Sequence, residues 1–165
     1  MVGAAPKVFI SYSWTPKTTV EKVYELATRL REHGVDVILD KWCLKEGQDK
    51  YTFMEQMVKD ETIDRVLIMC DESYAVKADD RKGGVGDETV IITPEVYGSA
   101  KQDKFIPVIL EKSDDGTPFR PIYLKSRIYF DLSNEETYEA EYERILRNLH
   151  KMPEHKMPPL GNIPE

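Results

Sequence analysis

Four short runs of apolar, β-forming residues constrain the fold of this chain more than any other feature of its sequence. The run from Arg65 to Cys70 reads Arg-Val-Leu-Ile-Met-Cys and predicts a strand that is apolar on both faces. Such a strand has to be buried on both sides, as it is at the centre of a parallel sheet covered by helices. Three similar runs and one shorter run predict the other strands: residues 7–12, 35–39, 105–110 and 128–130.

Segments with helical spacing separate these runs. Thr18 and Glu21 have the spacing of a capping box before one helix, and Ser133 and Glu136 repeat it before another that ends near Leu149. The remaining expected segments are helices over 51–60 and 88–98 and polar connections over 40–49 and 71–87. This alternation predicts one α/β domain with a flavodoxin-like, doubly wound, five-stranded parallel sheet in the order 2-1-3-4-5. Its crossovers are expected to be right-handed, with helices on both faces.

One glycine and two prolines predict local details. Gly34 sits where the first helix would stop. Pro94 is expected to distort or divide the helix over 88–98. Pro107 removes a ladder donor from the strand over 105–110, which predicts a bulge or a locally unpaired position there.

The charge of the chain excludes one class of function. Acidic residues number 30 and basic residues 23, which gives a net charge of −7. This balance argues against a general nucleic-acid binder, because such a protein needs a basic face. Residues 131–143 hold six of the acids and no Lys or Arg, so the rest of the chain, with 24 acids and 23 bases, does not exclude an anionic ligand. In the segment 40–50, Lys41, Lys45 and Lys50 offset Asp40, Glu46 and Asp49.

The sequence predicts a cytoplasmic domain followed by a tail. No apolar run approaches the roughly 20 residues that cross a membrane, and the first six residues lack the features of a signal peptide. Cys43 and Cys70 make neither a disulfide framework nor a zinc ligand set. Residues 1–150 are expected to form the domain. Residues 151–165, which contain four of the ten prolines, are expected to be a linker or tail that leads to a further domain.

The predicted topology nominates the place where a ligand would bind. In open α/β sheets, ligands bind outside the carboxyl ends of the strands, near the point where the strand order reverses. Three segments follow strands at that edge: Ser11–Pro16, Asp40–Asp49 and Asp71–Glu88.

These three segments also carry a resemblance to a known family. Val8-Phe9-Ile10-Ser11-Tyr12-Ser13-Trp14 is similar to the opening box of TIR domains, and more closely to that of their SEFIR-like bacterial relatives. Asp40-Lys41-Trp42-Cys43-Leu44-Lys45-Glu46-Gly47-Gln48-Asp49 resembles the BB loop of the family. Gly83-Gly84-Val85-Gly86-Asp87-Glu88 resembles its third box. The three boxes occur in the order of the family, within a match that runs from about Lys7 to Leu149.

The resemblance implies an NAD+ glycohydrolase, which cleaves the bond between nicotinamide and ribose and needs neither cofactor nor metal. It implies that Glu88 is the catalytic carboxylate, in a Trp-x-x-x-Glu pattern whose tryptophan position is Gly84 in this chain. Stacking against nicotinamide would then come from Trp14 or Trp42. The other expected substrate-binding residues are Tyr12, Ser13, Asp40, Leu44 and Lys45. The expected assembly loop, which docks on a neighbouring subunit, comprises Lys41, Cys43, Glu46, Gly47, Gln48 and Asp49.

A single carboxylate can support this reaction. Breaking the ribosyl bond develops oxocarbenium character, which a nearby carboxylate stabilises, and nicotinamide leaves as a neutral base. A structural interpretation of Glu88 stays open, because an acidic residue also suits the first turn of a helix. Glu55 is an alternative candidate for the catalytic carboxylate. Asp40 could contact substrate or cap a local turn. Trp14 and Trp42 could contact a ligand or only shape their loops.

Two functions of different classes remain. In the first, the resemblance implies an enzyme of bacterial immunity that is activated by self-association through the loop 40–50. A sensor domain fused after residue 165 would trigger it, as in TIR–STING proteins of antiphage defence. The alternative is a non-enzymatic signalling adaptor that uses the same surfaces for homotypic binding. Glu88 favours the enzyme, since an adaptor does not need it, and Gly84 favours the adaptor.

Overall fold

In a computed structural model, which describes residues 4–80 and 91–165, five strands form one parallel sheet in the order β2-β1-β3-β4-β5. This confirms the predicted flavodoxin-like topology. The strands are β1 (Lys7–Ser11), β2 (Asp36–Ile38), β3 (Arg65–Cys70), β4 (Phe105–Ile109) and β5 (Phe130–Asp131). β3 lies at the centre, between β1 and β4, as its two apolar faces require.

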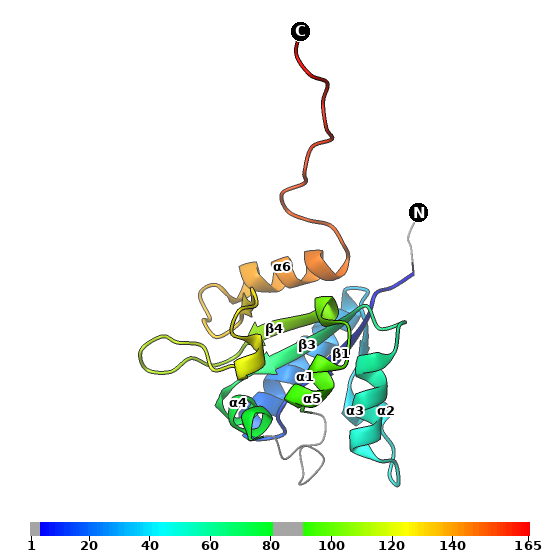
Figure 1. Cartoon of the computed structure of the whole chain (residues 1–165). Helices are drawn as coiled ribbons and strands as arrows, with labels where there is room; N and C mark the ends of the chain where they lie inside the picture. Colours follow the sequence, from blue (N-terminus) through cyan, green and yellow to red (C-terminus); the bar gives the residue numbers. More distant parts are fainter. Residues whose placement is uncertain (1–3, 81–90) are drawn as a thin grey trace.

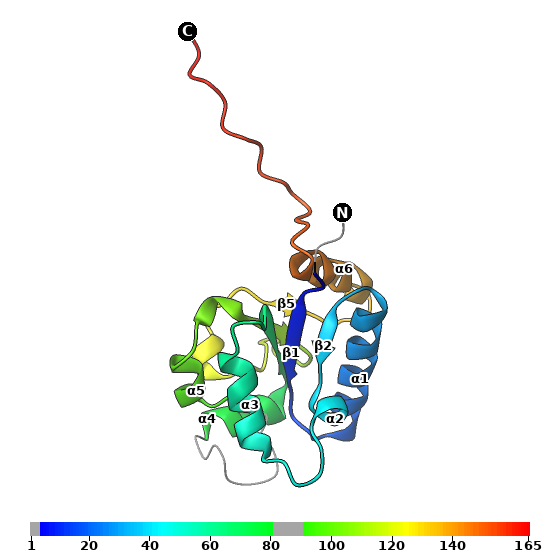
Figure 2. The same ribbon diagram turned by 90° about the vertical axis from the view of Figure 1, so that its right-hand side faces the viewer.

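Helices cover both faces of the sheet (Figures 1 and 2). They are α1 (Lys17–Glu32), α2 (Asp40–Cys43), α3 (Lys50–Lys59), α4 (Glu72–Asp79), α5 (Pro94–Gly98) and α6 (Tyr138–Leu149), with short 3₁₀ turns at Gln102–Lys104 and Ile122–Leu124. Leu67 and Met69 of β3 pack into one buried cluster with α1 and α6. Val66 and Ile68 pack into a second cluster with α3, α4 and α5. The period-two alternation of β3 therefore feeds two separate cores.

Two segments that the sequence left without secondary structure contain helices. α4 lies within the polar stretch 71–87, where Tyr74 and Ala78 are its only buried residues and the carboxylate of Asp71 caps its first turn. Two apolar positions four residues apart are too few to stand out as an amphipathic pattern. α2 is a single turn at the start of the expected loop 40–49.

Both predicted capping boxes are wrong. α1 begins at Lys17 after Pro16, without a side-chain cap, and α6 begins only at Tyr138. Thr18, the predicted cap of the first helix, lies inside α1, and the hydroxyl of Ser133, the predicted cap of the last helix, donates to Asp131 at 2.5 Å. A capping box needs its hydroxyl for the backbone at the start of the helix, so neither residue can cap its helix.

The proline positions differ in part from expectation. Of the helix expected over 88–98, the described residues show only α5, in which Pro94 occupies the first turn and Thr93 is the N-cap; residues 88–90 lie outside the described residues. Pro107 causes no bulge, because the register of β3 and β4 continues through the pair Ile68–Pro107. β5 pairs with β4 only from Val108 onward, so Pro107 faces no residue of that strand.

The fifth strand begins later than predicted. The sequence predicts a strand over 128–130, but Ile128 is 92% exposed and only Phe130 and Asp131 pair with β4. The backbone N–H of Asp131 donates to Glu141 of α6 at 2.9 Å, and its carboxylate pairs with Lys112 at 2.5 Å. These two contacts of Asp131 hold the end of the short strand β5 in place.

The tail leaves the domain after α6. Beyond Leu149 the residues form no helix or strand, and the chain runs away from the body of the molecule in both views (Figures 1 and 2). Met157, Leu160 and Ile163 are each at least 86% exposed. Over residues 4–80 and 91–165, no helix has the length and apolar character that crossing a bilayer requires.

Gly34 ends α1 as the sequence predicts. Its φ is +86°, and a Cβ there would lie 3.5 Å from Cε1 of His150. We expect Gly34→Ala to lower the free energy of unfolding by about 1–2 kcal/mol, because the left-handed conformation is strained for an L side chain. Urea denaturation measures this. Gly98→Ala is the matched control, since Gly98 closes α5 with no atom within 4 Å of an added Cβ. It should leave stability unchanged or raise it, and equal losses in both variants would contradict the explanation.

Candidate functional site

The strand order reverses between β1 and β3, and polar side chains collect at the carboxyl ends of these strands. The segments after β1, β2 and β3 meet there: Tyr12 to Thr15, Asp40 to Lys41, and Asp71 to Ser73. This is the edge that the topology nominates for a ligand. We call this group of segments the carboxyl-edge site.

A buried carboxylate organises one side of the carboxyl-edge site. Asp40 is 2% exposed, and its Oδ1 accepts hydrogen bonds from the hydroxyl of Tyr12 at 2.6 Å and from the backbone N–H of Lys41 at 2.8 Å. Its Oδ2 accepts from Nε1 of Trp14 at 2.8 Å. Burial, followed by the hydrogen bond to Asp40, raises the pKa of Tyr12 above its ordinary value, so this hydroxyl remains a donor. Asp40 therefore joins the ends of β1 and β2.

The indole of Trp14, which Asp40 holds, is in contact with two ammonium groups. Nζ of Lys41 lies 4.7 Å and Nζ of Lys50 lies 4.1 Å from the centroid of the Trp14 ring. Trp14 is half-buried, and the two lysines come from α2 and from the first position of α3. The result is an aromatic surface next to two positive charges, at a strand end.

Hydroxyl groups line the other side of the carboxyl-edge site, between β1 and α4. The hydroxyl of Ser13 lies 2.8 Å from that of Ser73, which also lies 3.3 Å from the hydroxyl of Thr15. Nζ of Lys77 donates to Thr15 at 3.3 Å.

A second buried carboxylate belongs to Asp71, which is 2% exposed. It accepts hydrogen bonds from the hydroxyl of Thr19 and from the backbone N–H of Tyr74. Asp71 is thus engaged in holding α4 against α1.

Two tyrosines fix the backbone at Ile92. The hydroxyl of Tyr74 accepts from the backbone N–H of Ile92 at 3.0 Å and hydrogen-bonds Ser11 at 2.7 Å. The hydroxyl of Tyr123 donates to the carbonyl of Ile92 at 2.5 Å. Burial raises the pKa of both tyrosines.

Glu88, the expected catalytic residue, and Gly84 lie outside the described residues, so the role of Glu88 stays a prediction.

The predicted assembly loop is mostly exposed. Lys45, Glu46, Gly47 and Gln48 are exposed, Leu44 is half-buried, and Gly47 has a φ of +88°. The loop is closed by a hydrogen bond from the Lys45 N–H to the Gln48 side chain at 2.6 Å. Asp49 caps α3 by accepting from the N–H of Tyr51, and the Thr52 hydroxyl and this N–H lower its pKa. Asp49, which the resemblance assigns to the assembly loop, therefore also caps the helix that follows the loop.

Trp42 faces a different surface from Trp14. Its ring lies edge-on to Tyr24 of α1 at 6.1 Å and below the guanidinium of Arg31 at 6.0 Å. Together with Thr28, Glu32, Cys43 and the strand β2 it lines a hollow of about 570 Å³, which we call the Trp42 groove. Substrate contact by Asp40 or Trp42 stays a prediction, and the contacts of Trp42 with Tyr24 and Arg31 differ from those of Trp14.

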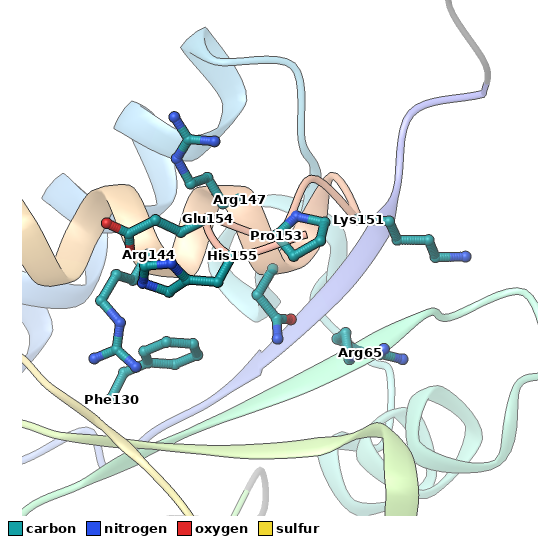
Figure 3. A pocket seen from close by; sticks show the side chains of 9 residues that line it. Arg65, Phe130, Arg144, Arg147, Lys151, Pro153, Glu154 and His155 are labelled. Carbon is teal, nitrogen blue, oxygen red and sulfur yellow. The ribbon is translucent and has the colours of Figure 1, made fainter. Parts of the chain in front are cut away.

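A second hollow, of about 450 Å³, lies at the end of the sheet opposite to the carboxyl-edge site. It is surrounded by α6, β5 and the start of the tail (Figure 3). Arg65, Arg144, Arg147 and Lys151 line it together with Phe130 and Glu154. The guanidinium groups of Arg144 and Arg147 pair with Glu141 and Glu143. Figure 3 shows Arg147 and Lys151 directed away from each other, so the charges do not converge on one point.

The structure brings together some of the predicted site residues and adds others. Tyr12, Ser13, Trp14 and Asp40 meet at one edge, although Tyr12 and Ser13 are buried beneath it. The sequence analysis includes Lys50 only in the charge balance and does not name Ser73. The spacing of residues along the chain gives no signal for the contact of Lys50 with Trp14 or of Ser73 with Ser13. Glu55, the rival carboxylate, lies on α3 and approaches Lys59 at 3.7 Å. Within the described ranges, no three His, Cys, Asp or Glu side chains cluster in a way that would hold a metal.

Comparison with known proteins identifies relatives of the chain. The family model of the SEFIR domain matches residues 6–149. The crystal structure of a prokaryotic SEFIR domain is 42% identical in sequence, with a TM-score of 0.79 over 95% of this chain and 100% of that one. The TIR domain of the Toll-related receptor TRR-2 from the lower metazoan Hydra magnipapillata shares the fold alone, with 13% identity and a TM-score of 0.61 over 86% of this chain and 96% of that one. A comparison with curated proteins finds no match.

The three bonds to Asp40 predict a sensitive position. We expect Asp40→Asn to lower the free energy of unfolding by about 1–3 kcal/mol, because an amide nitrogen in place of one oxygen leaves a buried donor without an acceptor. Urea denaturation followed by the fluorescence of Trp14 and Trp42 measures this. Asp49→Asn is the control, since asparagine caps a helix as well as aspartate does. If both variants were equally stable, Asp40 would not be the organising group.

Proposed function

The chain belongs to the SEFIR domain family, and from this premise we propose that it is an NAD+ glycohydrolase activated by self-association. The observation that carries the proposal is the group formed by Trp14, Lys41 and Lys50 at the carboxyl-edge site. A dinucleotide combines flat aromatic rings with a pyrophosphate, and this group offers an aromatic surface beside two ammonium groups. The resemblance to TIR domains, many of which cleave NAD+, supports the same substrate.

Binding would exchange one set of contacts for another. Without ligand, the two ammonium groups occupy the face of the Trp14 ring by cation–π attraction. A base or nicotinamide ring stacked on the indole would displace an ammonium group, which would then meet a phosphate oxygen. Asp40 supports this by holding Nε1 of Trp14, so the indole has a fixed orientation before ligand arrives.

Glu88 is our candidate for the catalytic carboxylate. Asp40 and Asp71, the two buried carboxylates of the carboxyl-edge site, are engaged in hydrogen bonds that hold the fold. Ile92, four residues along the chain from Glu88, is fixed at the same edge by Tyr74 and Tyr123. A carboxylate there would stabilise the oxocarbenium-like ribose as the bond to nicotinamide breaks. Water, or another group of the ADP-ribose itself, would then attack the ribose carbon and complete the reaction.

Self-association through the loop 40–50 is part of the proposal. The exposed side chains of Lys45, Glu46 and Gln48 form a surface that a second copy could contact next to the Trp14 group. In the cell, a sensor fused beyond residue 165 would bring copies together in the cytoplasm, as part of a bacterial antiphage response. On this proposal, an isolated domain has little activity.

The second candidate is a non-enzymatic signalling adaptor. The observation that favours it is Gly84, which replaces the tryptophan of the Trp-x-x-x-Glu pattern and removes an aromatic wall from the expected cleft. An adaptor would use the exposed loop 44–48 for homotypic binding and would leave NAD+ intact. Membership of the SEFIR family is compatible with both candidates.

Release of nicotinamide from NAD+ by concentrated, crowded protein tests the proposal. We expect Glu88→Gln to reduce the rate by about 100-fold or more, since it removes the charge that stabilises the transition state. We expect Lys50→Ala to raise KM more than it lowers kcat, because it removes a binding contact.

Glu55→Gln is the matched control, because this carboxylate lies outside the carboxyl-edge site and pairs with Lys59. It should keep full activity with an unchanged circular dichroism spectrum. If Glu55→Gln loses activity and Glu88→Gln keeps it, the assignment of the carboxylate is wrong. If no assembled state releases nicotinamide, the adaptor is the better description.

A further inference from the structure

The Trp42 groove offers an apolar surface that the domain itself does not cover. Trp42 is 40% exposed, although Tyr24 and Arg31 hold one side of its ring. The hollow of about 570 Å³ falls within the range of roughly 300–1,000 Å³ that is typical of sites for compact ligands. An indole that is fixed on one side and open on the other is a common anchor at protein interfaces.

The groove does not suit an added β-strand. β2 is an edge strand of only three residues, and Nη1 of Arg31 donates to the carbonyl of Val37 at 2.9 Å and to Asp36 at 3.1 Å. This guanidinium occupies an acceptor that an incoming strand would need, which is one way in which proteins protect sheet edges. The occupant should therefore bind through its side chains, without a backbone ladder.

The tail of this chain has the matching chemistry. Met157-Pro158-Pro159-Leu160 contains two adjacent prolines flanked by apolar side chains that are 86% and 101% exposed. Adjacent prolines favour the polyproline II helix, which makes no internal hydrogen bonds and docks into aromatic-lined grooves at a low cost in conformational entropy. Lys156 precedes this segment, and the carboxylate of Glu32 lines the groove, so the charges are complementary as well.

We propose that the segment Met157–Leu160 of one copy binds in the Trp42 groove of a second copy. The tail projects away from its own domain in both views, which presents it to a neighbour (Figures 1 and 2). Because the groove and the tail are different surfaces, the contact is heterologous and leaves one free tail and one free groove at the ends, so association can continue into chains. This contact is independent of the NAD+ chemistry proposed above.

Sedimentation velocity of the full chain over a wide concentration range tests the proposal. We expect assemblies that grow with concentration and dissociate when a peptide of residues 151–165 is added in excess, whereas a scrambled peptide has no effect. Leu160→Ser in the tail and Trp42→Ser in the groove should each weaken association by about tenfold or more, because each removes an apolar anchor. Thr28→Arg, an exposed position of α1 that lines the groove, should block it without burying the new side chain.

A mixture of two variants separates this arrangement from a symmetric dimer. Leu160→Ser keeps a groove and Trp42→Ser keeps a tail, so an equimolar mixture should form dimers that do not grow further. Ile128→Ser is the control for loss of an exposed apolar side chain, since Ile128 is 92% exposed, and it should associate like the wild type. Association that survives in Leu160→Ser and in Thr28→Arg would overturn the proposal and point to the loop 40–50. A wild type that is monomeric at every concentration would overturn it as well, whether or not the peptide binds.

Discussion

Burial of the sheet on both faces decides where polar chemistry can occur in this domain. β3 sends Leu67 and Met69 into one core and Val66 and Ile68 into the other, so neither face of the central strand is open to water. Polar side chains are left with the strand ends, and there they have to satisfy one another because burial without a partner is costly. Asp40 and Asp71 show the outcome, since each is 2% exposed and each accepts several hydrogen bonds.

The parts of the fold that follow from local apolar pattern could be predicted, and the parts that depend on tertiary partners could not. The strand 65–70 and the stop at Gly34 were readable because burial and a positive φ leave direct marks in the sequence. The helix starts were not, since α1 begins after Pro16 without a side-chain cap and Asp131 engages the hydroxyl of Ser133, the predicted cap of α6. The site shows the same division: the segments were predictable from topology, but the single turn of α2, which gives Lys41 and Trp42 different surroundings, was not.

The two candidate functions share one physical basis. Asp40 fixes Trp14 and the start of the loop 40–50, so a ligand cleft and a homotypic surface would both be built on the same buried carboxylate. An enzyme and an adaptor would then differ less in their framework than in the few side chains that approach a bound ring.

The positions of the chain ends have a consequence for how such a domain can be controlled. β1 begins and the tail leaves at the same edge of the sheet, opposite to the carboxyl-edge site (Figures 1 and 2). A protein module attached through residues 151–165 would therefore join the domain at the edge opposite to the site. Short flexible tethers create effective concentrations in the millimolar range, so such a module could act by valency alone. Gathering several copies would convert weak contacts into an occupied interface without any change in the shape of the domain.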